Sequence, residues 1–579
     1  MNQPGRRFPL PETAVHAALA GFLLAASDGA AAQAPPGSSA LPQSQATPDA
    51  QDGGLQEVVV TARKRSESLL SVPDSVSVIG AEEIVDRRLN QIGDFLALTP
   101  NVSMVKDQDA ATNIIAIRGI GSNRNQAASV AFAVDGVILP DSDAFTTDLT
   151  DAEQVEVLKG PQGALYGKGA IAGAINITTH APGDTPEVDL RTSYGSGHNF
   201  NAFASVGGPL IEGRLRGGLA VKYENDDGTI DNRYTGRPTD GNRFKKVGGR
   251  LIFEATDALT FDLKGSWFNQ TTGAAGYSLG NVLGTTGGAI TSQLAGIKPD
   301  FDSDPQTSRR TIYEGSLTTT YKLDAGTITS ITAYDDINVN LNEELDWSPL
   351  PLIPNVTQER ATRGLSQEVR FTSPDSERLR YIVGAYYQNT RRYVDTNGKF
   401  DLCLFLGDNC LAPLGATTGI LVPLALANTL VKSNQYATFG QINYDITKQL
   451  DLTLALRYDR DDQKQHDYLG VRVDAASFAA TQPKVSLAYK WSGNLMSYVT
   501  YSQGYKSGAF NPAPEPGAPF PLVVQKEGTS NFELGLKSVL LGRRLLFNVA
   551  TFLTNYHNPQ IFQFDANTGG QYTSSIGWI

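Results

Sequence analysis

Residues 450–459 read LDLTLALRYD, and polar and apolar side chains alternate through most of the stretch. One set of alternate positions holds leucines and a tyrosine, and the other holds Asp451, Thr453, Ala455, Arg457 and Asp459. Because successive side chains of a β-strand point to opposite faces, this pattern predicts a strand with one apolar and one polar face. Residues 259–267, LTFDLKGSW, behave in the same way. A water-soluble β-sandwich also alternates, so the strand pattern alone does not identify the fold.

The connections between the predicted strands separate these alternatives. Strand-like segments follow one another from residue 186 to residue 579, and every second connection is short. The short connections lie at residues 207–213, 256–258, 324–326, 373–377, 447–449, 493–494 and 541–542. The others are mostly long, polar and rich in Gly and Pro, an asymmetry typical of a transmembrane antiparallel β-barrel with short periplasmic turns. Trp267 and Trp491, near strand ends, fit its aromatic girdles.

The composition excludes several other classes of protein. The 579 residues carry a net charge of -12 and include only two Cys and five His. Two thiols cannot support a disulfide scaffold or a multi-thiolate metal site, and few histidines remain for a metal centre. The negative charge argues against a nucleic-acid partner, whose phosphates need Lys and Arg. Past the N-terminus there is no run of about 18 apolar residues, so we expect no helical membrane span.

The N-terminus has the pattern of an export signal. Arg6 and Arg7 precede an apolar stretch at residues 14–26, and three alanines follow at residues 30–32. This order predicts a signal peptide over residues 1–32, with cleavage after Ala32. Residues 33–56 are rich in Pro, Gln, Ser, Ala, Gly and Asp, so we expect a flexible periplasmic tether.

A short β-prone hexamer follows the tether. It comprises Glu57, Val58, Val59, Val60, Thr61 and Ala62. Consecutive β-branched residues favour an extended backbone, and an extended unpaired segment can add itself as a strand to another protein's sheet. The alternative is the first buried strand of the next domain, and the residues alone favour neither reading.

Residues 63–180 predict a compact α+β domain. A strand is expected at residues 71–79, short helices at 81–88 and 92–98, and strands ending in Gly at 114–121 and 131–137. Residues 155–177 then carry Gly160-Pro161, Leu165-Tyr166-Gly167 and a β-prone end. The order of these pieces, the Gly-Pro-x-x-x-Leu-Tyr-Gly element and Ile117-Arg118-Gly119 resemble the plug domain of TonB-dependent outer-membrane receptors.

The resemblance implies both an architecture and a function. It implies a mostly β fold in which the plug (63–180) fills the lumen of a transmembrane antiparallel β-barrel (186–579), and it makes residues 57–62 the TonB box. It implies active uptake across the outer membrane of a Gram-negative bacterium, most commonly of a ferric siderophore or similar iron complex. The implied partners are TonB with its inner-membrane energising complex, the small extracellular ligand, and outer-membrane lipid with lipopolysaccharide. The resemblance also implies a monomer that has no cofactor and no enzymatic activity. The alternatives are a passive porin-like channel and uptake of a non-iron substrate.

The strand count departs from the family pattern. We count about fifteen strands, the last from Leu545 to about Asn555, and residues 570–579 would begin a sixteenth. The resemblance implies a barrel closed by about 22 strands. An open sheet edge in hydrocarbon leaves backbone groups without partners, so we expect a fragment or a prematurely terminated product of a longer gene. The alternative is a smaller barrel closed by sixteen strands.

Several residues are candidates for specific contacts. The resemblance places Arg118 and Lys159 at the plug's basic positions and Glu533 at a facing barrel carboxylate; the alternative is that Glu533 faces water. Cys403 and Cys410 share one long outer connection, so we expect a disulfide in that exported loop. We expect His198, His466 and His557, and the acidic runs at residues 224–228 and 459–462, to be polar or solvated loop residues rather than metal ligands.

Two motifs of soluble enzymes occur in incomplete form. Residues 163–168 lack the spacing and the final Ser or Thr of a phosphate-binding loop. Residues 276–280, GYSLG, match a nucleophile elbow but have no helical pattern behind them. We therefore expect no catalytic residue.

Overall fold

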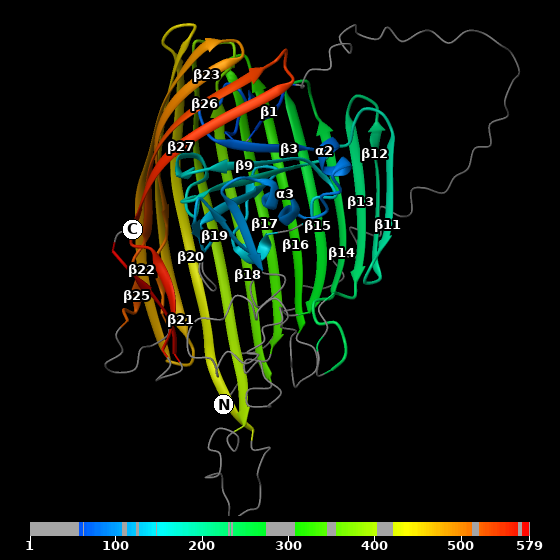
Figure 1. Ribbon diagram of the computed structural model, residues 1–579, viewed down its shortest axis with the longest axis vertical. Helices are drawn as coiled ribbons and strands as arrows, with labels where there is room; N and C mark the ends of the chain where they lie inside the picture. The colour runs from blue at the N-terminus through cyan, green and yellow to red at the C-terminus, as the bar shows by residue number, and fades with distance from the viewer. Residues whose placement is uncertain are drawn as a thin grey trace, which may run out of the picture. The chain divides into compact units, whose positions relative to one another are not determined.

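The computed structural model describes residues 57–61, 63–106, 113–122, 127–145, 148–229, 232, 235–273, 307–343, 355–401, 421–511, 520–565 and 570–577. The described residues belong to one compact unit, Gly54–Ile579, shown in Figure 1. The predicted signal peptide and tether lie outside them, as do Ala62, Cys403, Cys410 and the GYSLG motif.

One large antiparallel sheet, here called the wall, contains 15 strands that pair in chain order. Its first eight strands are β11 (Glu187–Gly195), β12 (Asn199–Ile211), β13 (Leu215–Asp226), β14 (Asn242–Glu254), β15 (Leu259–Gly273), β16 (Thr307–Leu323), β17 (Gly326–Glu343) and β18 (Asn355–Thr372). The other seven are β19 (Leu379–Asp401), β20 (Leu421–Asp445), β21 (Leu450–Asp467), β22 (Arg472–Ser492), β23 (Leu495–Lys506), β26 (Glu527–Leu540) and β27 (Leu545–His557). The predicted count of about fifteen strands is confirmed.

Two small hairpins accompany the wall. One comprises β24 (Ala509–Phe510) and β25 (Val523–Val524), between β23 and β26. The other comprises β28 (Gln560–Asp565) and β29 (Gly570–Ser575). The segment that would begin a sixteenth wall strand therefore pairs with β28 in a two-stranded sheet of its own.

The wall strands carry their apolar side chains outward, as a membrane-spanning sheet requires. In β21, Leu456 is 54% exposed and Tyr458 49%, whereas Arg457 and Asp459 between and beside them are 0% exposed. A water-soluble sandwich would bury the leucines and expose the charges. The inverted burial therefore supports the membrane barrel expected from the connections.

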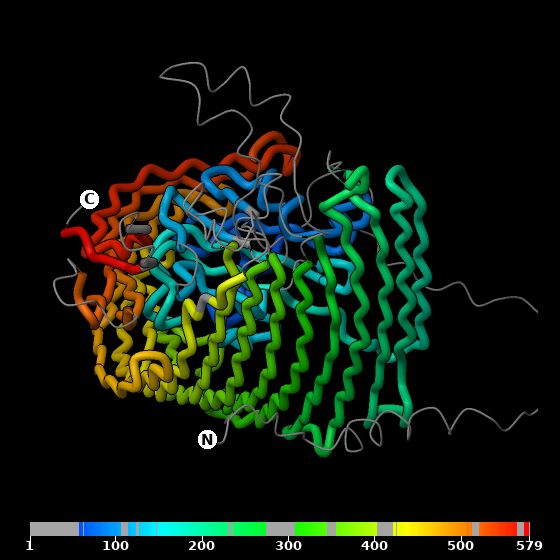
Figure 2. The backbone as a smooth tube through the Cα atoms, turned by 90° about the horizontal axis from the view of Figure 1, so that it is seen from below, coloured from blue at the N-terminus to red at the C-terminus, as the bar shows by residue number. Residues whose placement is uncertain are grey.

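The plug is built around a five-stranded sheet in the order β3-β9-β10-β7-β8. These strands are β3 (Val76–Gly80), β7 (Val130–Val134), β8 (Val137–Ile138), β9 (Ala152–Lys159) and β10 (Gly173–Thr179). A three-stranded sheet adds β4 (Val102–Lys106), β5 (Asn113–Ile117) and β6 (Ile120–Gly121), and the helices are α2 (Ala81–Asp86), α3 (Ile92–Leu98), the 3-10 turn η1 (Ser142–Ala144) and α4 (Gly163–Tyr166). Figures 1 and 2 both show the wall curving round these elements.

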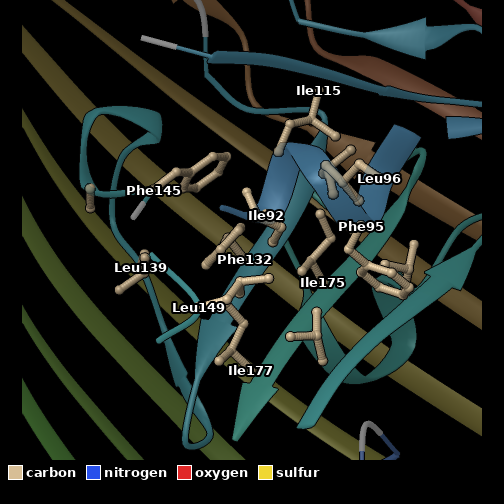
Figure 3. Close-up of a cluster of buried hydrophobic side chains, with 14 of the residues drawn as sticks. Ile92, Phe95, Leu96, Ile115, Phe132, Leu139, Phe145, Leu149, Ile175 and Ile177 are labelled. Atoms are coloured by element: carbon tan, nitrogen blue, oxygen red, sulfur yellow. The ribbon is translucent and has the colours of Figure 1, made fainter. Parts of the chain in front are cut away.

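The plug has its own apolar core, shown in Figure 3. Ile92 and Leu96 of α3 are fully buried against Ile175 of β10 and Phe132 of β7. The helix begins with a capping box, in which the Asp94 carboxylate accepts from the backbone N–H of Gln91 at 3.0 Å. The core therefore forms from plug residues, and the wall contributes a few side chains such as Phe268 and Ile312.

No helix among the described residues is both long enough and apolar enough to span a membrane.

Candidate functional site

The hexamer at residues 57–62 is extended and docked at its described positions. Val59 and Val60 form β1 and pair antiparallel with β2 (Glu67–Ser68). The side chain of Val60 is buried with Leu69 and Val72, whereas Val58 and Val59 are exposed. The structure thus combines the two readings of the sequence: the segment forms a strand, but a short one, with two of its three valines exposed to solvent.

Polar groups of the plug sheet hold the hexamer in place. The carboxylate of Glu156, on β9, accepts from the backbone N–H of Thr61 at 2.7 Å and from its hydroxyl at 3.0 Å. Gln154 donates to the carbonyl of Val59 at 2.9 Å and to Glu156 at 2.8 Å. Hydrogen bonds rather than a large apolar contact therefore keep residues 57–61 on the plug.

Three basic residues follow the hexamer directly, and we call Arg63, Lys64 and Arg65 the basic anchor. Lys64 forms an ion pair with Glu368 of β18 at 2.5 Å. Arg65 pairs with Asp375 and donates to the carbonyls of Ser373 and Tyr381 at 3.2 Å. Burial lowers the pKa of Lys64 to about 8. The anchor ties the start of the plug to the short connection between β18 and β19.

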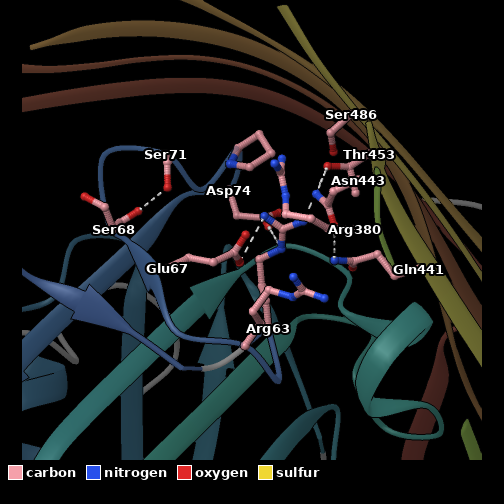
Figure 4. Close-up of polar contacts among 12 residues, drawn as sticks. Arg63, Glu67, Ser68, Ser71, Asp74, Arg380, Gln441, Asn443, Thr453 and Ser486 are labelled. Atoms are coloured by element: carbon pink, nitrogen blue, oxygen red, sulfur yellow. Dashed lines mark hydrogen bonds and ion pairs between the residues drawn. The ribbon is translucent and has the colours of Figure 1, made fainter. Parts of the chain in front are cut away.

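Arg63 belongs to a polar cluster that Figure 4 shows between the plug and the wall. Its guanidinium lies 3.4 Å from Glu67 and 3.9 Å from Asp74. The Asp74 carboxylate also accepts from the Lys484 ammonium at 2.7 Å. Burial works against ionisation of Asp74, yet Lys484 and Arg63 hold its pKa below its usual value.

The structure brings Arg118 and Glu533 together, as the resemblance implied. Arg118 Nη2 lies 2.6 Å from Glu533 Oε2, and both side chains are buried. Glu533 also accepts from the Tyr498 hydroxyl at 2.6 Å and from the backbone N–H of Ser75 at 3.1 Å. The alternative that Glu533 faces water does not describe this arrangement.

A two-residue turn aims Arg118 at the wall. Arg118 and Gly119 have φ values of +56° and +79°, which join β5 to β6 with Ile117 opposite Ile120. The guanidinium then lies over the ring of Phe552, 3.9 Å from its centroid. These two positive φ values therefore set the direction of the arginine side chain.

Lys159 lies beside this pair but does not share its contacts. Burial, and then repulsion from Arg118, lowers the pKa of Lys159 to about 8. Within the part of the chain that the structure describes, its ammonium makes no hydrogen bond or ion pair, so its role as a plug–wall contact stays a prediction.

The glycines of the Gly-Pro-x-x-x-Leu-Tyr-Gly element allow close approach to the wall. A Cβ at Gly160 would lie 2.9 Å from Arg118 Nη1, and one at Gly163 would lie 1.9 Å from Gln482 Oε1. A Cβ at Gly167 would lie 2.6 Å from the Arg457 guanidinium. A side chain at Gly163 or Gly167 would displace polar groups of the wall, and one at Gly160 would displace Arg118 of the plug.

Further ion pairs join acidic plug residues to basic wall residues, the reverse of the expected polarity. Asp143 accepts from both Arg360 Nε and Nη2, at 2.8 and 3.0 Å. Asp148 lies 2.7 Å from Lys222 and 3.2 Å from Lys246. Burial opposes ionisation of Asp148, but the two lysines hold its pKa far below its usual range. Sequence reasoning missed these residues because isolated aspartates in loops carry no local signal.

The remaining sequence candidates have different outcomes. The residues at 459–462 are not solvated loop, because they lie within β21, and Asp459 and Asp461 are fully buried beside Arg457 and Lys168. His198 is exposed and lies 2.9 Å from Asp227. The described residues contain no group of three or more His, Cys, Asp or Glu that could hold a metal ion.

Comparisons with known proteins agree with this architecture. The family model "TonB-dependent Receptor Plug Domain" matches residues 68–174, and "TonB dependent receptor-like, beta-barrel" matches residues 187–577. The pesticin receptor of Yersinia pestis is 25% identical over 515 residues, which cover 87% of this chain and 71% of the relative.

Solved structures show the same fold. The ferric yersiniabactin uptake receptor FyuA from Yersinia pestis aligns with a TM-score of 0.72 at 21% identity, covering 87% of this chain and 74% of the other. The ferripyoverdine receptor of the outer membrane of Pseudomonas aeruginosa aligns with a TM-score of 0.69 at 16% identity, covering 92% and 70%. With both family models matched and the plug seated against the wall, the chain belongs to the family of TonB-dependent receptors.

Proposed function

We propose that this receptor takes up a scarce iron complex of the ferric siderophore class across the outer membrane, driven by TonB acting on residues 57–62. The observation that carries the proposal is the place of the hexamer. The basic anchor that follows it binds the short connection between β18 and β19, and short connections face the periplasm in a barrel of this kind. TonB would approach from that side.

The contacts of the hexamer leave it accessible to a binding partner. Val58 and Val59 are exposed, and β1 pairs with one short strand, so an incoming strand has both an edge and side chains to recognise. The plug behind it fills space that a passive pore would leave open, with its own core and ion pairs to the wall. This favours driven uptake over a passive porin-like channel.

The names of the relatives support an iron complex as the cargo. They include a ferric yersiniabactin uptake receptor, a ferripyoverdine receptor and a "Ferric enterobactin receptor PirA" that is 27% identical over 311 residues. A vitamin B12 transporter is also among them, at 29% identity over 172 residues, so a non-iron cargo is the alternative outcome.

The test of coupling is Val59→Pro, with Val59→Thr as the matched control. Proline removes an N–H and blocks ladder pairing, whereas threonine keeps the β-branch and the N–H. Cells would be given radioiron as ferric yersiniabactin or ferripyoverdine, and surface binding and uptake would be measured separately. We expect Val59→Pro to retain binding and lose uptake, and Val59→Thr to retain both. Normal uptake by Val59→Pro would refute the role of the hexamer, and no binding of either complex would count against this cargo.

A further inference from the structure

A cavity of about 160 Å³ lies between the plug and wall strands β12 to β17. Its plug side includes the apolar side chains of Val134, Val137, Leu139 and Ile177, and the polar residues Asp135, Asp148, Asp151, Thr179 and His180 also line it. Leu139 and Ile177 are labelled in Figure 3, at the edge of the plug core. The proposed uptake assigns no role to this cavity.

On the wall side, the cavity is lined by one row of residues that lie directly opposite one another on neighbouring strands. Directly opposed residues on successive strands are Ser205, Ala220, Gly248, Ser266, Glu314 and Asp335. The first four have small side chains, which leave the space open, and the last two are carboxylates on neighbouring strands. Directly opposed side chains have Cβ atoms about 5 Å apart, so one ligand group can reach both carboxylates.

Asp335 is a buried acid without a counter-charge. It is 4% exposed, lines the cavity, and has no hydrogen bond or ion pair among the described residues. Glu314 accepts a hydrogen bond from the Ser266 hydroxyl at 2.7 Å. A buried carboxyl without a counter-charge keeps its proton, and a cation that enters the cavity would exchange with that proton and pair with the carboxylate.

The lysines and the arginine that line the cavity already pair with carboxylates other than Asp335. Lys264 lies 2.7 Å from Asp135, Lys246 lies 3.2 Å from Asp148, and Arg250 lies 2.7 Å from Asp262. Each of these cations therefore has its own carboxylate, and none supplies a contact to Asp335.

We propose that this cavity binds a small alkylammonium ion. The ammonium would lie between Asp335 and Glu314, and a short carbon chain would pack against the valines and Leu139 of the plug. A divalent metal fits less well, because hard cations take six or more oxygen ligands, and in the row only the Ser266 hydroxyl lies next to the two carboxylates. The volume suits the ligand, since a cavity of about 150 Å³ holds a molecule of benzene's size.

The test is a titration of the purified chain in detergent with n-butylammonium chloride, at constant sodium chloride, followed by calorimetry. n-Butanol serves as the uncharged probe of equal length. We expect saturable binding of the ammonium, at least tenfold weaker binding of the alcohol, and at least a tenfold loss of ammonium affinity in Asp335→Asn. Asp336→Asn is the control, because Asp336 is the next residue of β17, pairs with Arg363 and does not line the cavity.

Filling the space gives a second test that leaves the carboxylates unchanged. A Cβ at Gly248 would have its nearest neighbour at 3.9 Å, so Gly248→Ala should fold and bind normally, whereas Gly248→Leu should occupy the cavity and abolish binding. The proposal is overturned by absent saturable binding, by equal losses in Asp335→Asn and Asp336→Asn, or by full affinity in Gly248→Leu. Because the measurement uses purified protein and no iron complex, none of these outcomes bears on the proposed uptake.

Discussion

The hexamer and the basic anchor are adjacent in the chain but are held in different ways. Residues 57–61 rest on hydrogen bonds to Gln154 and Glu156, with Val58 and Val59 in solvent. In the basic anchor, Lys64 forms a buried ion pair with Glu368, and Arg65 donates to the carbonyls of Ser373 and Tyr381. A detachable segment is thus followed immediately by a fixed one. The buried ion pair between Arg118 and Glu533 is a second fixed contact of the plug with the wall.

The largest effect should come from the fixed contacts. Arg118→Ala leaves Glu533 buried without its counter-charge, and breaking a buried pair costs about 3–5 kcal/mol. We expect the plug to become sensitive to limited proteolysis while β-sheet content is kept. Arg87→Ala is the control, because Arg87 pairs with Glu83 on the exposed face of α2 and should change little. Unchanged protease resistance in Arg118→Ala would show that the pair does not hold the plug.

A smaller and more local effect is expected at the hexamer. Glu156→Ala removes the carboxylate that accepts from Thr61, and hydrogen bonds to a charged group contribute about 1.5–3 kcal/mol. A spin label placed at Val58, which is exposed, should become mobile while the plug core stays protected. If the label remained immobile, the apolar contact of Val60 rather than Glu156 would be what holds the hexamer.

The turn that directs Arg118 should be sensitive to a Cβ. Gly119→Ala places alanine at φ +79°, a conformation that costs about 1–2 kcal/mol for an L-residue, although nothing lies within 4 Å of the new atom. Gly80→Ala is the matched control, since it has equal space and an N-cap φ of -98°. Equal unfolding midpoints in urea for the two variants would contradict the role of backbone conformation here.

The smallest effect is a pH dependence of the anchor. Lys64 has a pKa of about 8 in the folded protein and 10.5 as its ordinary value, so above pH 8 the unfolded chain binds more protons and stability rises with pH. Between pH 7 and pH 8.5 the expected gain is less than about 1 kcal/mol. The urea midpoint for plug release should rise over this interval, and Lys64→Met should flatten the rise. If the urea midpoint rose equally with pH in the wild-type protein and in Lys64→Met, Lys64 would not be the titrating group.

The sequence predicted the fold where local patterns determine it. Period-two alternation predicted the wall strands, and the short connections predicted that consecutive strands pair. The boundaries of α3 were predicted to the residue. Arg118 and Glu533 could be found through the family resemblance, because short motifs surround both. Asp74, Asp143 and Asp148 could not, since each finds its lysine or arginine only after the plug and the wall meet.

Two expectations failed or changed for physical reasons. Residues 459–462 look like a solvated acidic run, but a strand in this wall turns alternate side chains toward the plug. There Asp459 pairs with Arg457, and Asp461 pairs with Lys168. Residues 570–575 look like another wall strand, yet they pair with β28, which lies just before them in the chain and forms a hairpin with them.

The ion pairs of the plug also imply an order of assembly during folding. Asp148 and Lys222 are 74 residues apart, Asp143 and Arg360 217, and Asp74 and Lys484 410. The middle of the plug therefore finds a partner on a wall strand close to it in the chain, while its beginning needs strands that lie much further along the chain. Closing long loops is slow and entropically unfavourable, so the segment carrying the hexamer should be the last part of the plug to settle. A chaperone would meet that segment unprotected for longest.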